Sequence, residues 1–145
     1  MQTSYFGNMH NEGNYISIAR RNPDWFEGRT MIKLAPDWSL IKAGYSRKKF
    51  EYEYRKRILE KLDPAKVYEE LGEDAILLCW EKPQDFCHRE VVADWLEENI
   101  EGLEITETGF EDKITRKKEL EEKGHIKPQQ KNNVKLVDKN KIMLF

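Results

Sequence analysis

The stretch Ala75-Ile-Leu-Leu-Cys-Trp80 decides the fold of this chain. It is apolar at every position and lacks the alternation of a strand with one face in water, so it predicts a central strand covered by helices on both faces. Strands of this kind occur mainly in parallel sheets, whose connections are usually helical. We therefore expect an α/β fold built around residues 75–80.

Helix signals flank this strand in the sequence. Before it, Asp63-Pro64 joins a capping side chain to a proline at the first helical position, and Gly72 ends the helix. An earlier helix is expected after Ser46, with apolar residues at a spacing of four down to Leu62. A third helix is expected over about residues 86–100, with this buried stripe: Val91, Val92, Trp95, Leu96 and Ile100.

Shorter elements complete the predicted sheet. Residues 2–6, 14–19, 30–34 and 103–106 have the composition of strands, and Asp37 is expected to cap a brief helical turn through Lys42. The order of elements predicts a Rossmann-like, mostly parallel sheet flanked by helices, with right-handed crossovers.

The chain divides by charge near residue 109. Residues 110–145 hold 10 Lys and Arg against 6 Asp and Glu, whereas residues 1–109 are net acidic. We expect residues 1–109 to form the α/β core and residues 110–145 to form an extension, with a charged helix over 110–123, a loop over 125–133 and a hairpin over 133–145. A Lys-rich face in solvent is the simpler interpretation of the extension, and contact with an acidic partner is the alternative.

Composition excludes several classes of protein. The net charge of −2 argues against a general nucleic-acid binder, and the longest apolar run is far too short to span a membrane. No export signal opens the chain, so its 2 cysteines are expected to be reduced thiols in the cytoplasm. Oligomeric state has no signal in the sequence.

The expected topology points to one edge of the sheet. Ligands in open parallel sheets bind beyond the carboxyl ends of the strands, which selects the loops at residues 7–13, 20–25 and 81–89. The third loop is the richest, because Glu81 follows the central strand and Cys87-His88-Arg89 occupies the first turn of the next helix. Free N–H groups at a helix start favour an anion or a thiolate.

These residue types define a candidate site. Glu81, Cys87 and His88 are the candidate catalytic residues, with Cys87 as a nucleophile and Glu81 or His88 as the acid or base. The candidate ligand-binding residues are two arginines that would hold a phosphate or carboxylate, and two residues at the end of the first strand: Arg20, Arg89, Tyr5 and Asn8.

Each assignment has a structural alternative. Cys79 is expected to be a small core residue, Cys87 and His88 fit buried structural roles equally well, and Glu81 fits a pairing with Arg89. A metal site at Cys79, Cys87 and His88 lacks a fourth ligand and the usual zinc spacing, so we expect no metal, and no cofactor-binding motif is present. One aromatic set is suited to stacking a base but is expected to be mostly core: Tyr5, Phe6, Trp25, Phe26, Trp38 and Tyr45.

Residues 77–89, followed by Val92-Ala-Asp-Trp-Leu96, resemble the conserved pattern of domain of unknown function family 488. In that family a strand ending in Cys-x-Glu is followed by Cys-His-Arg at a helix start, and Arg20-x-x-Pro23 resembles its second marked element. The strand before Arg20 reads Ser-Ile-Ala, so an acidic group found in many relatives is missing here. The resemblance covers about residues 3–106 and implies one shared site, listed as Arg20, Glu81, Cys87, His88 and Arg89.

Three functions remain open from the sequence. The first is an enzyme that acts on a phosphate-bearing, nucleotide- or nucleoside-like anion at the Cys-His-Arg segment. The second is a non-catalytic module that binds a nucleotide or an exposed base. The third, with weaker support, is nucleic-acid association through the Lys-rich extension.

Overall fold

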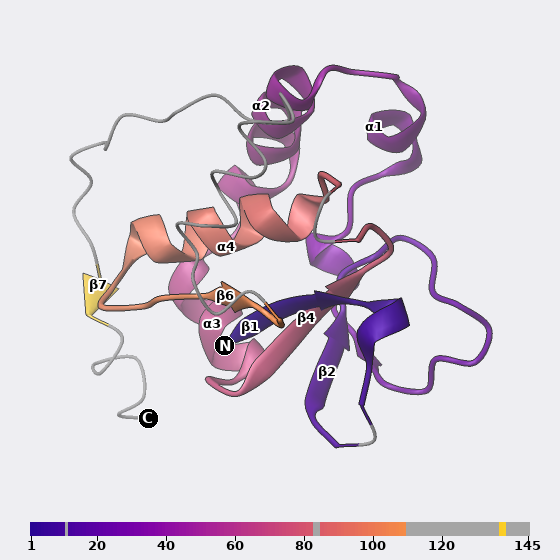
Figure 1. Cartoon of the computed structure of the whole chain (residues 1–145). Helices are drawn as coiled ribbons and strands as arrows, with labels where there is room; N and C mark the ends of the chain where they lie inside the picture. Colours follow the sequence, from indigo (N-terminus) through magenta and orange to yellow (C-terminus); the bar gives the residue numbers. More distant parts are fainter. Residues whose placement is uncertain (11, 83–84, 110–136, 139–145) are drawn as a thin grey trace.

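A five-stranded, all-parallel sheet forms the centre of the molecule, in the order β3-β2-β4-β1-β6 (Figure 1). The structure is a computed structural model that describes residues 1–10, 12–82, 85–109 and 137–138. The predicted Rossmann-like parallel sheet is confirmed, with the apolar stretch at its centre. The strands are β1 (Gln2–Tyr5), β2 (Asn14–Ser17), β3 (Arg29–Thr30), β4 (Ala75–Cys79) and β6 (Thr106–Glu107).

The predicted caps begin the first three helices. Asp37 accepts a hydrogen bond from the backbone N–H of Leu40 at 2.8 Å, and Ser46 and Asp63 cap their helices in the same way. These side chains satisfy backbone donors that a helix start leaves without partners. The helices are α1 (Trp38–Lys42), α2 (Arg47–Arg57), α3 (Pro64–Leu71) and α4 (His88–Asn99).

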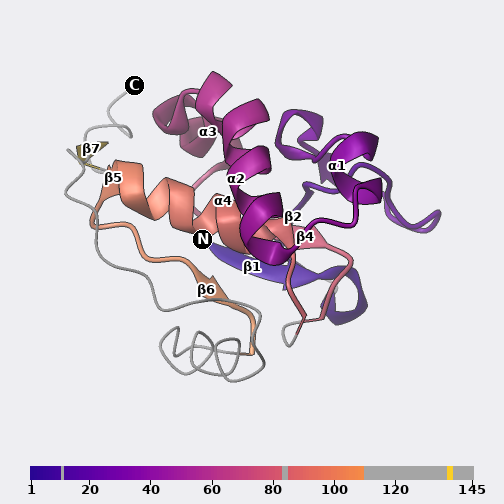
Figure 2. The ribbon, with the colours of Figure 1, turned by 90° about the horizontal axis from the view of Figure 1, so that it is seen from above.

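The four helices cover the same face of the sheet. Their buried side chains share one core cluster with Ile16, Ile18, Ala75 and Leu77, which project from β2 and β4 and the residue after β2. Figure 2 shows α2, α3 and α4 on one side of β1. Among the described residues, the opposite face is covered by a smaller cluster around Phe6, so helices on both faces, as the apolar run predicted, are not seen in this part of the chain.

Two predicted elements end earlier than expected. The strand predicted over 30–34 is β3 followed by a 3-10 helix, Ile32–Leu34, which turns Leu34 fully into the core. Helix α2 stops at Arg57, and a 3-10 helix, Leu59–Lys61, continues the chain and buries Leu59. In both places the chain leaves the regular strand or helix that the sequence pattern predicts, and the 3-10 turn buries a leucine.

The extension meets the core at one described point. Strand β7 (Val137–Asp138) pairs in parallel with β5 (Ile100–Glu101), the short strand that follows α4. The predicted helix over 110–123, the loop over 125–133 and most of the hairpin over 133–145 lie outside the described residues. Within the described ranges, none of the helices is long and apolar enough to cross a membrane.

Candidate functional site

A pocket of about 470 Å³ opens beyond the carboxyl ends of β2 and β4. Residues directly after these two strands form its base, and the first turns of α2 and α4 and the segment around α1 form its walls. Its position agrees with the rule for ligand sites in open parallel sheets. The lining residues are Ala19, Arg20, Arg21, Pro36, Trp38, Ile41, Tyr45, Arg47, Phe50, Cys79, Trp80, Glu81, Phe86, Cys87 and His88.

The structure brings four of the predicted site residues to this pocket: Arg20, Glu81, Cys87 and His88. Tyr5 and Asn8 do not line it. The chain after β1 turns into a 3-10 helix, Phe6–Asn8, whose Phe6 packs on the opposite face of the sheet against Trp25, Phe26 and Trp80. The described residues of the loop, 7–10 and 12–13, are therefore not among those that line the pocket.

Three arginines and one carboxylate give the pocket lining a positive balance. Arg20 donates Nε to the carbonyl of Pro36 at 3.0 Å and Nη2 to that of Ala35 at 3.2 Å, so neutral groups hold its guanidinium. Within the described part of the chain, no carboxylate lies in ion-pair distance of Arg20 or Arg21. Arg47 pairs with Glu90 at 3.5 Å, whereas Arg20 acts on the carboxyl group of Asp37 from beyond ion-pair distance, where its charge helps to lower the pKa of Asp37.

Aromatic side chains form much of the remaining wall. Trp38 and Trp80 are 48% and 52% exposed, which is unusual for large apolar residues. Tyr45, Phe50 and Phe86 complete the set, and Phe50 and Phe86 meet edge to face at 5.6 Å between ring centres. A cavity with aromatic walls and a few cationic groups suits a ligand that has a planar ring and a negative charge.

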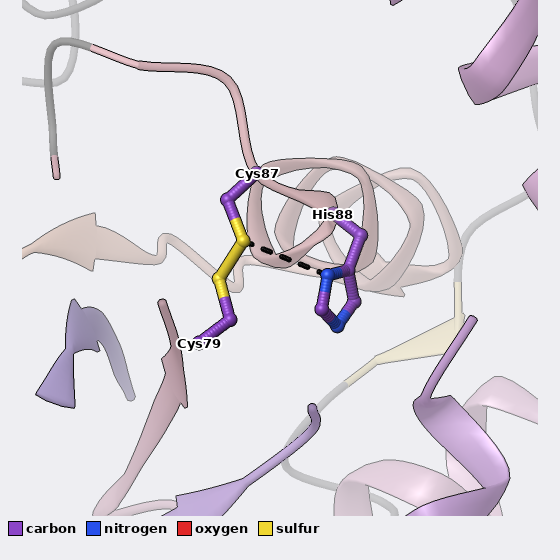
Figure 3. Close-up of side chains that lie close together, drawn as sticks. All are labelled: Cys79, Cys87 and His88. Carbon is purple, nitrogen blue, oxygen red and sulfur yellow. Dashed lines mark hydrogen bonds between the residues drawn. A yellow bond between two sulfur atoms is a disulfide. The ribbon is translucent and has the colours of Figure 1, made fainter. Parts of the chain in front are cut away.

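Cys79 and Cys87 are joined in a disulfide, so the expectation of two free thiols is wrong for this structure (Figure 3). Cys79 is the last residue of β4, and Cys87 is the N-cap of α4. The parallel sheet carries the strand end and the helix start to the same edge, and this brings together two sulfur atoms separated by eight positions in the sequence. Both residues are buried and both line the pocket.

The imidazole of His88 has a defined tautomer. Its Nε2 lies 2.6 Å from the backbone carbonyl of Ile18, and a carbonyl only accepts, so Nε2 carries the proton. Nδ1 is then unprotonated and lies 3.5 Å from Sγ of Cys87. Burial, opposed by the hydrogen bond to Ile18 and helped by the positive charge of Arg89, lowers the pKa of His88 to about 4. The ring is therefore neutral at pH 7.

Arg89 lies beneath the pocket and does not line it. Its side chain is fully buried and donates Nε and Nη2 to the two carboxylate oxygens of Glu107, at 3.0 and 3.1 Å. Nη1 lies 2.9 Å from Sγ of Cys79, and Thr3 donates to Glu107 at 2.6 Å. The alternative pairing of Glu81 with Arg89 is wrong, since Glu81 is exposed at the pocket rim and Arg89 has Glu107 as its partner.

Cys79, Cys87 and His88 also form the cluster best suited to a metal among the described residues. Their two sulfur atoms and one ring nitrogen all lie within 4.8 Å of one another. After reduction of the disulfide, two thiolates and Nδ1 would offer a three-ligand set of the type that holds zinc. The hydrogen bond from Nε2 to a backbone carbonyl is also the usual outer contact of a metal-bound histidine.

A comparison with family models matches residues 7–100 to DUF488-N3a, described as an active DUF488-N3 subclade. The chain belongs to the DUF488 family. The predicted membership is thus confirmed, and the matched region contains Arg20 and the whole Cys79-to-Arg89 segment. Glu107 and Thr3, which hold Arg89, lie outside the region matched to DUF488. Searches of curated proteins and of solved structures found no match.

Sequence reasoning missed several residues of this DUF488 site. Arg47 and Phe50 enter the pocket from the first turn of α2, where only tertiary packing places them. Glu107 lies in the short strand β6, and its polar side chain gave no indication in the sequence that it would be buried beside β1. Trp38 and Tyr45 were in the aromatic set proposed for base stacking, and these two of its six members line the pocket.

Proposed function

We propose that this DUF488 protein is a cytoplasmic enzyme that binds a phosphate-bearing, nucleotide-like ligand in the pocket and attacks it with reduced Cys87. The observation that carries the proposal is the tautomer of His88, whose unprotonated Nδ1 faces Sγ of Cys87 on the pocket wall. A hydrogen-bond acceptor beside the thiol fixes the direction of its sulfur, and the start of helix α4 at Cys87 favours the thiolate that would attack.

In this proposal Arg20 and Arg21 contact the anionic group of the ligand. Neither arginine forms a direct ion pair with a carboxylate among the described residues, although Arg20 acts on Asp37 from a longer distance, so a phosphate would gain charge-assisted hydrogen bonds without breaking an ion pair. The planar ring of the ligand would stack on Trp38 or Trp80, which are about half exposed.

His88 and Glu81 have further roles in this proposal. His88 orients Cys87, because its free Nδ1 accepts a hydrogen bond from the thiol while its Nε2 remains bonded to Ile18; with a pKa of about 4 the ring is too weak a base to keep the thiol proton at pH 7. As Sγ of Cys87 bonds to the ligand, the bond from the attacked atom to its leaving group breaks, and Glu81, exposed in the pocket lining, gives that group a proton. The helix start at Cys87 adds a favourable field for the thiolate.

A non-catalytic binding module is the second candidate, and the disulfide favours it. A bonded Cys87 cannot act as a nucleophile, yet the arginines and the aromatic walls do not depend on the thiols. The same pocket would then hold a nucleotide without turnover.

The experiment is a thermal-shift screen of reduced protein against nucleotides, nucleosides and sugar phosphates. A ligand at about a hundred times its dissociation constant adds about 2.7 kcal/mol of stability. Arg20→Met should abolish the shift, and Arg29→Met, which changes an exposed arginine outside the pocket, should retain it. Arg89 is not used to test ligand binding, because it is fully buried and its substitution would lower the stability of the fold itself.

The stabilising compound is then incubated with wild type and with Cys87→Ser. Product formed by wild type alone supports the enzyme. Binding without product in reduced wild type supports the module, and no shift with any anionic compound contradicts both candidates.

A further inference from the structure

The two sulfur atoms of the disulfide have different surroundings. Cys87 lies on the pocket wall at the start of α4, beside the ring of His88, and is 6% exposed. Cys79 is 1% exposed at the end of β4, and its Sγ contacts Nη1 of Arg89 at 2.9 Å. Cys87 is therefore the slightly more exposed residue of two buried ones, and the sulfur of Cys79 contacts a permanent positive charge.

We propose that Cys79–Cys87 is a reversible disulfide that exchanges with a dithiol entering through the pocket, with Cys87 as the sulfur attacked and Cys79 as the leaving sulfur. The substrate class is a dithiol, either a small molecule or an exposed pair of thiols on a reducing protein. The exchange is an activity separate from attack on a nucleotide-like ligand.

The exchange conserves atoms and electrons. One thiolate of the dithiol attacks Sγ of Cys87, the bond between the protein sulfurs breaks, and its electron pair goes to Sγ of Cys79. The second thiol of the reductant then attacks the mixed disulfide and releases Cys87. The dithiol leaves as a disulfide, and its two electrons and two protons end on the two protein sulfurs.

Arg89 selects Cys79 as the leaving sulfur. Charge develops on the departing sulfur, and a thiolate that is stabilised leaves faster. Arg89 is held in place for this contact by two hydrogen bonds to Glu107, which Thr3 orients in turn. No motion of Arg89 is needed when the charge appears, so the stabilisation is built into the folded protein.

Access selects Cys87 as the sulfur attacked. Both cysteines line the pocket, but Cys87 is the N-cap of α4 and is slightly more exposed, whereas Cys79 is the last residue of the central strand β4. Amide groups at the helix start favour the approach of an anionic thiolate to this end of the disulfide.

If the proposed enzyme function holds, the disulfide also controls turnover. The oxidised form retains Arg20, Arg21 and the aromatic walls but lacks the nucleophile, so oxidation would stop turnover and leave ligand binding intact. Exchange with a dithiol would then switch the enzyme on. Exchange itself does not depend on the enzyme function, and its failure would be visible without any nucleotide ligand.

The direct test traps the intermediate in wild-type protein. Oxidised protein is treated briefly with a low concentration of glutathione, which has no second thiol to attack the mixed disulfide within the same molecule, then quenched with acid, alkylated and mapped by peptide mass. The expected species carries glutathione on Cys87 and the alkyl group on Cys79. The proposal is overturned if glutathione is found on Cys79. It is also overturned if Cys79 and Cys87 of the protein do not form a disulfide in an oxidising buffer.

The second test measures the rate of reduction by dithiothreitol in Arg89→Lys. Lysine retains the charge but not the fork that reaches both Glu107 and Cys79, so reduction should slow about tenfold or more. Arg29→Lys, in which the arginine is remote from the sulfurs, should match wild type. An unchanged rate in folded Arg89→Lys contradicts the role of Arg89. Reduced protein that holds one equivalent of zinc and does not reoxidise would instead assign these residues to a metal site.

Discussion

Arg89 and Glu107 face each other across the start of α4 and the edge strand β6, joined by two hydrogen bonds of 3.0 and 3.1 Å, with both side chains fully buried. Two parallel hydrogen bonds between a guanidinium and a carboxylate are among the strongest polar contacts in proteins. They connect the Cys-His-Arg segment to a strand outside the matched family region. The position of the reactive segment thus depends on residues that follow it in the chain.

Removal of Arg89 should destabilise the protein strongly. In Arg89→Met the carboxylate of Glu107 stays buried without its cation, and the free energy of unfolding should fall by about 3–5 kcal/mol. Arg89→Met with Glu107→Leu should recover much of this loss, because neither charge then remains. Urea unfolding of the oxidised proteins measures both.

The surface pair Lys33–Glu70 provides the control. Its side chains are 37% and 50% exposed, and Lys33→Met should cost less than about 1 kcal/mol. Equal losses in Lys33→Met and Arg89→Met would show that burial of the Arg89 pair carries no special cost.

His88 should make the folded protein sensitive to mild acid. Its pKa is lowered to about 4 in the folded state from the ordinary value of 6.5, so the unfolded state binds more protons between these values. The stability due to neutral His88 is complete above about pH 6.5 and is lost as the pH falls toward 4. Between pH 7 and pH 5 the loss should be about 2 kcal/mol.

Urea unfolding at the two pH values measures this loss, and His88→Gln is the matched control. Glutamine retains an amide donor for the carbonyl of Ile18 but does not titrate, so the variant should lose about 2 kcal/mol less than wild type over the same interval. The same pH dependence in both proteins would mean that other groups cause it.

Trp38 should distinguish nucleotides from simple anions. Stacking of a base on an aromatic ring contributes about 1–3 kcal/mol, so Trp38→Ala should weaken nucleotide binding about tenfold while leaving the affinity for inorganic phosphate unchanged. Trp25→Ala is the control, since Trp25 is also exposed but lies outside the pocket. Isothermal titration with both ligands separates the outcomes, and an equal effect on phosphate would count against stacking.

The sequence was most informative where local chemistry decides structure. Asp37, Ser46 and Asp63 cap helices because their side chains bond to backbone groups a few positions away, so no distant residue is needed to predict them. The apolar run at residues 75–80 likewise required no information from elsewhere, and the sheet edge followed from it.

What the sequence could not supply depends on contacts between distant segments. The disulfide depends on the distance between the end of β4 and the start of α4, and two cysteines in a chain without an export signal favoured free thiols. The burial of Arg89 depends on Glu107, which lies 18 positions away on an edge strand paired with β1. The arginine of the Cys-His-Arg segment was predicted to bind an anionic ligand, but in the structure Arg89 binds the carboxylate of Glu107.

The most direct test of the account is the alkylation of Cys87 by iodoacetamide in fully reduced wild-type protein at pH 7.5, with and without bound nucleotide, followed by peptide mass. Because Cys87 lines the pocket, a saturating nucleotide should slow its alkylation about tenfold or more. A rate at Cys87 that is the same with and without the ligand would contradict the assignment of Cys87 as the reactive residue of this pocket.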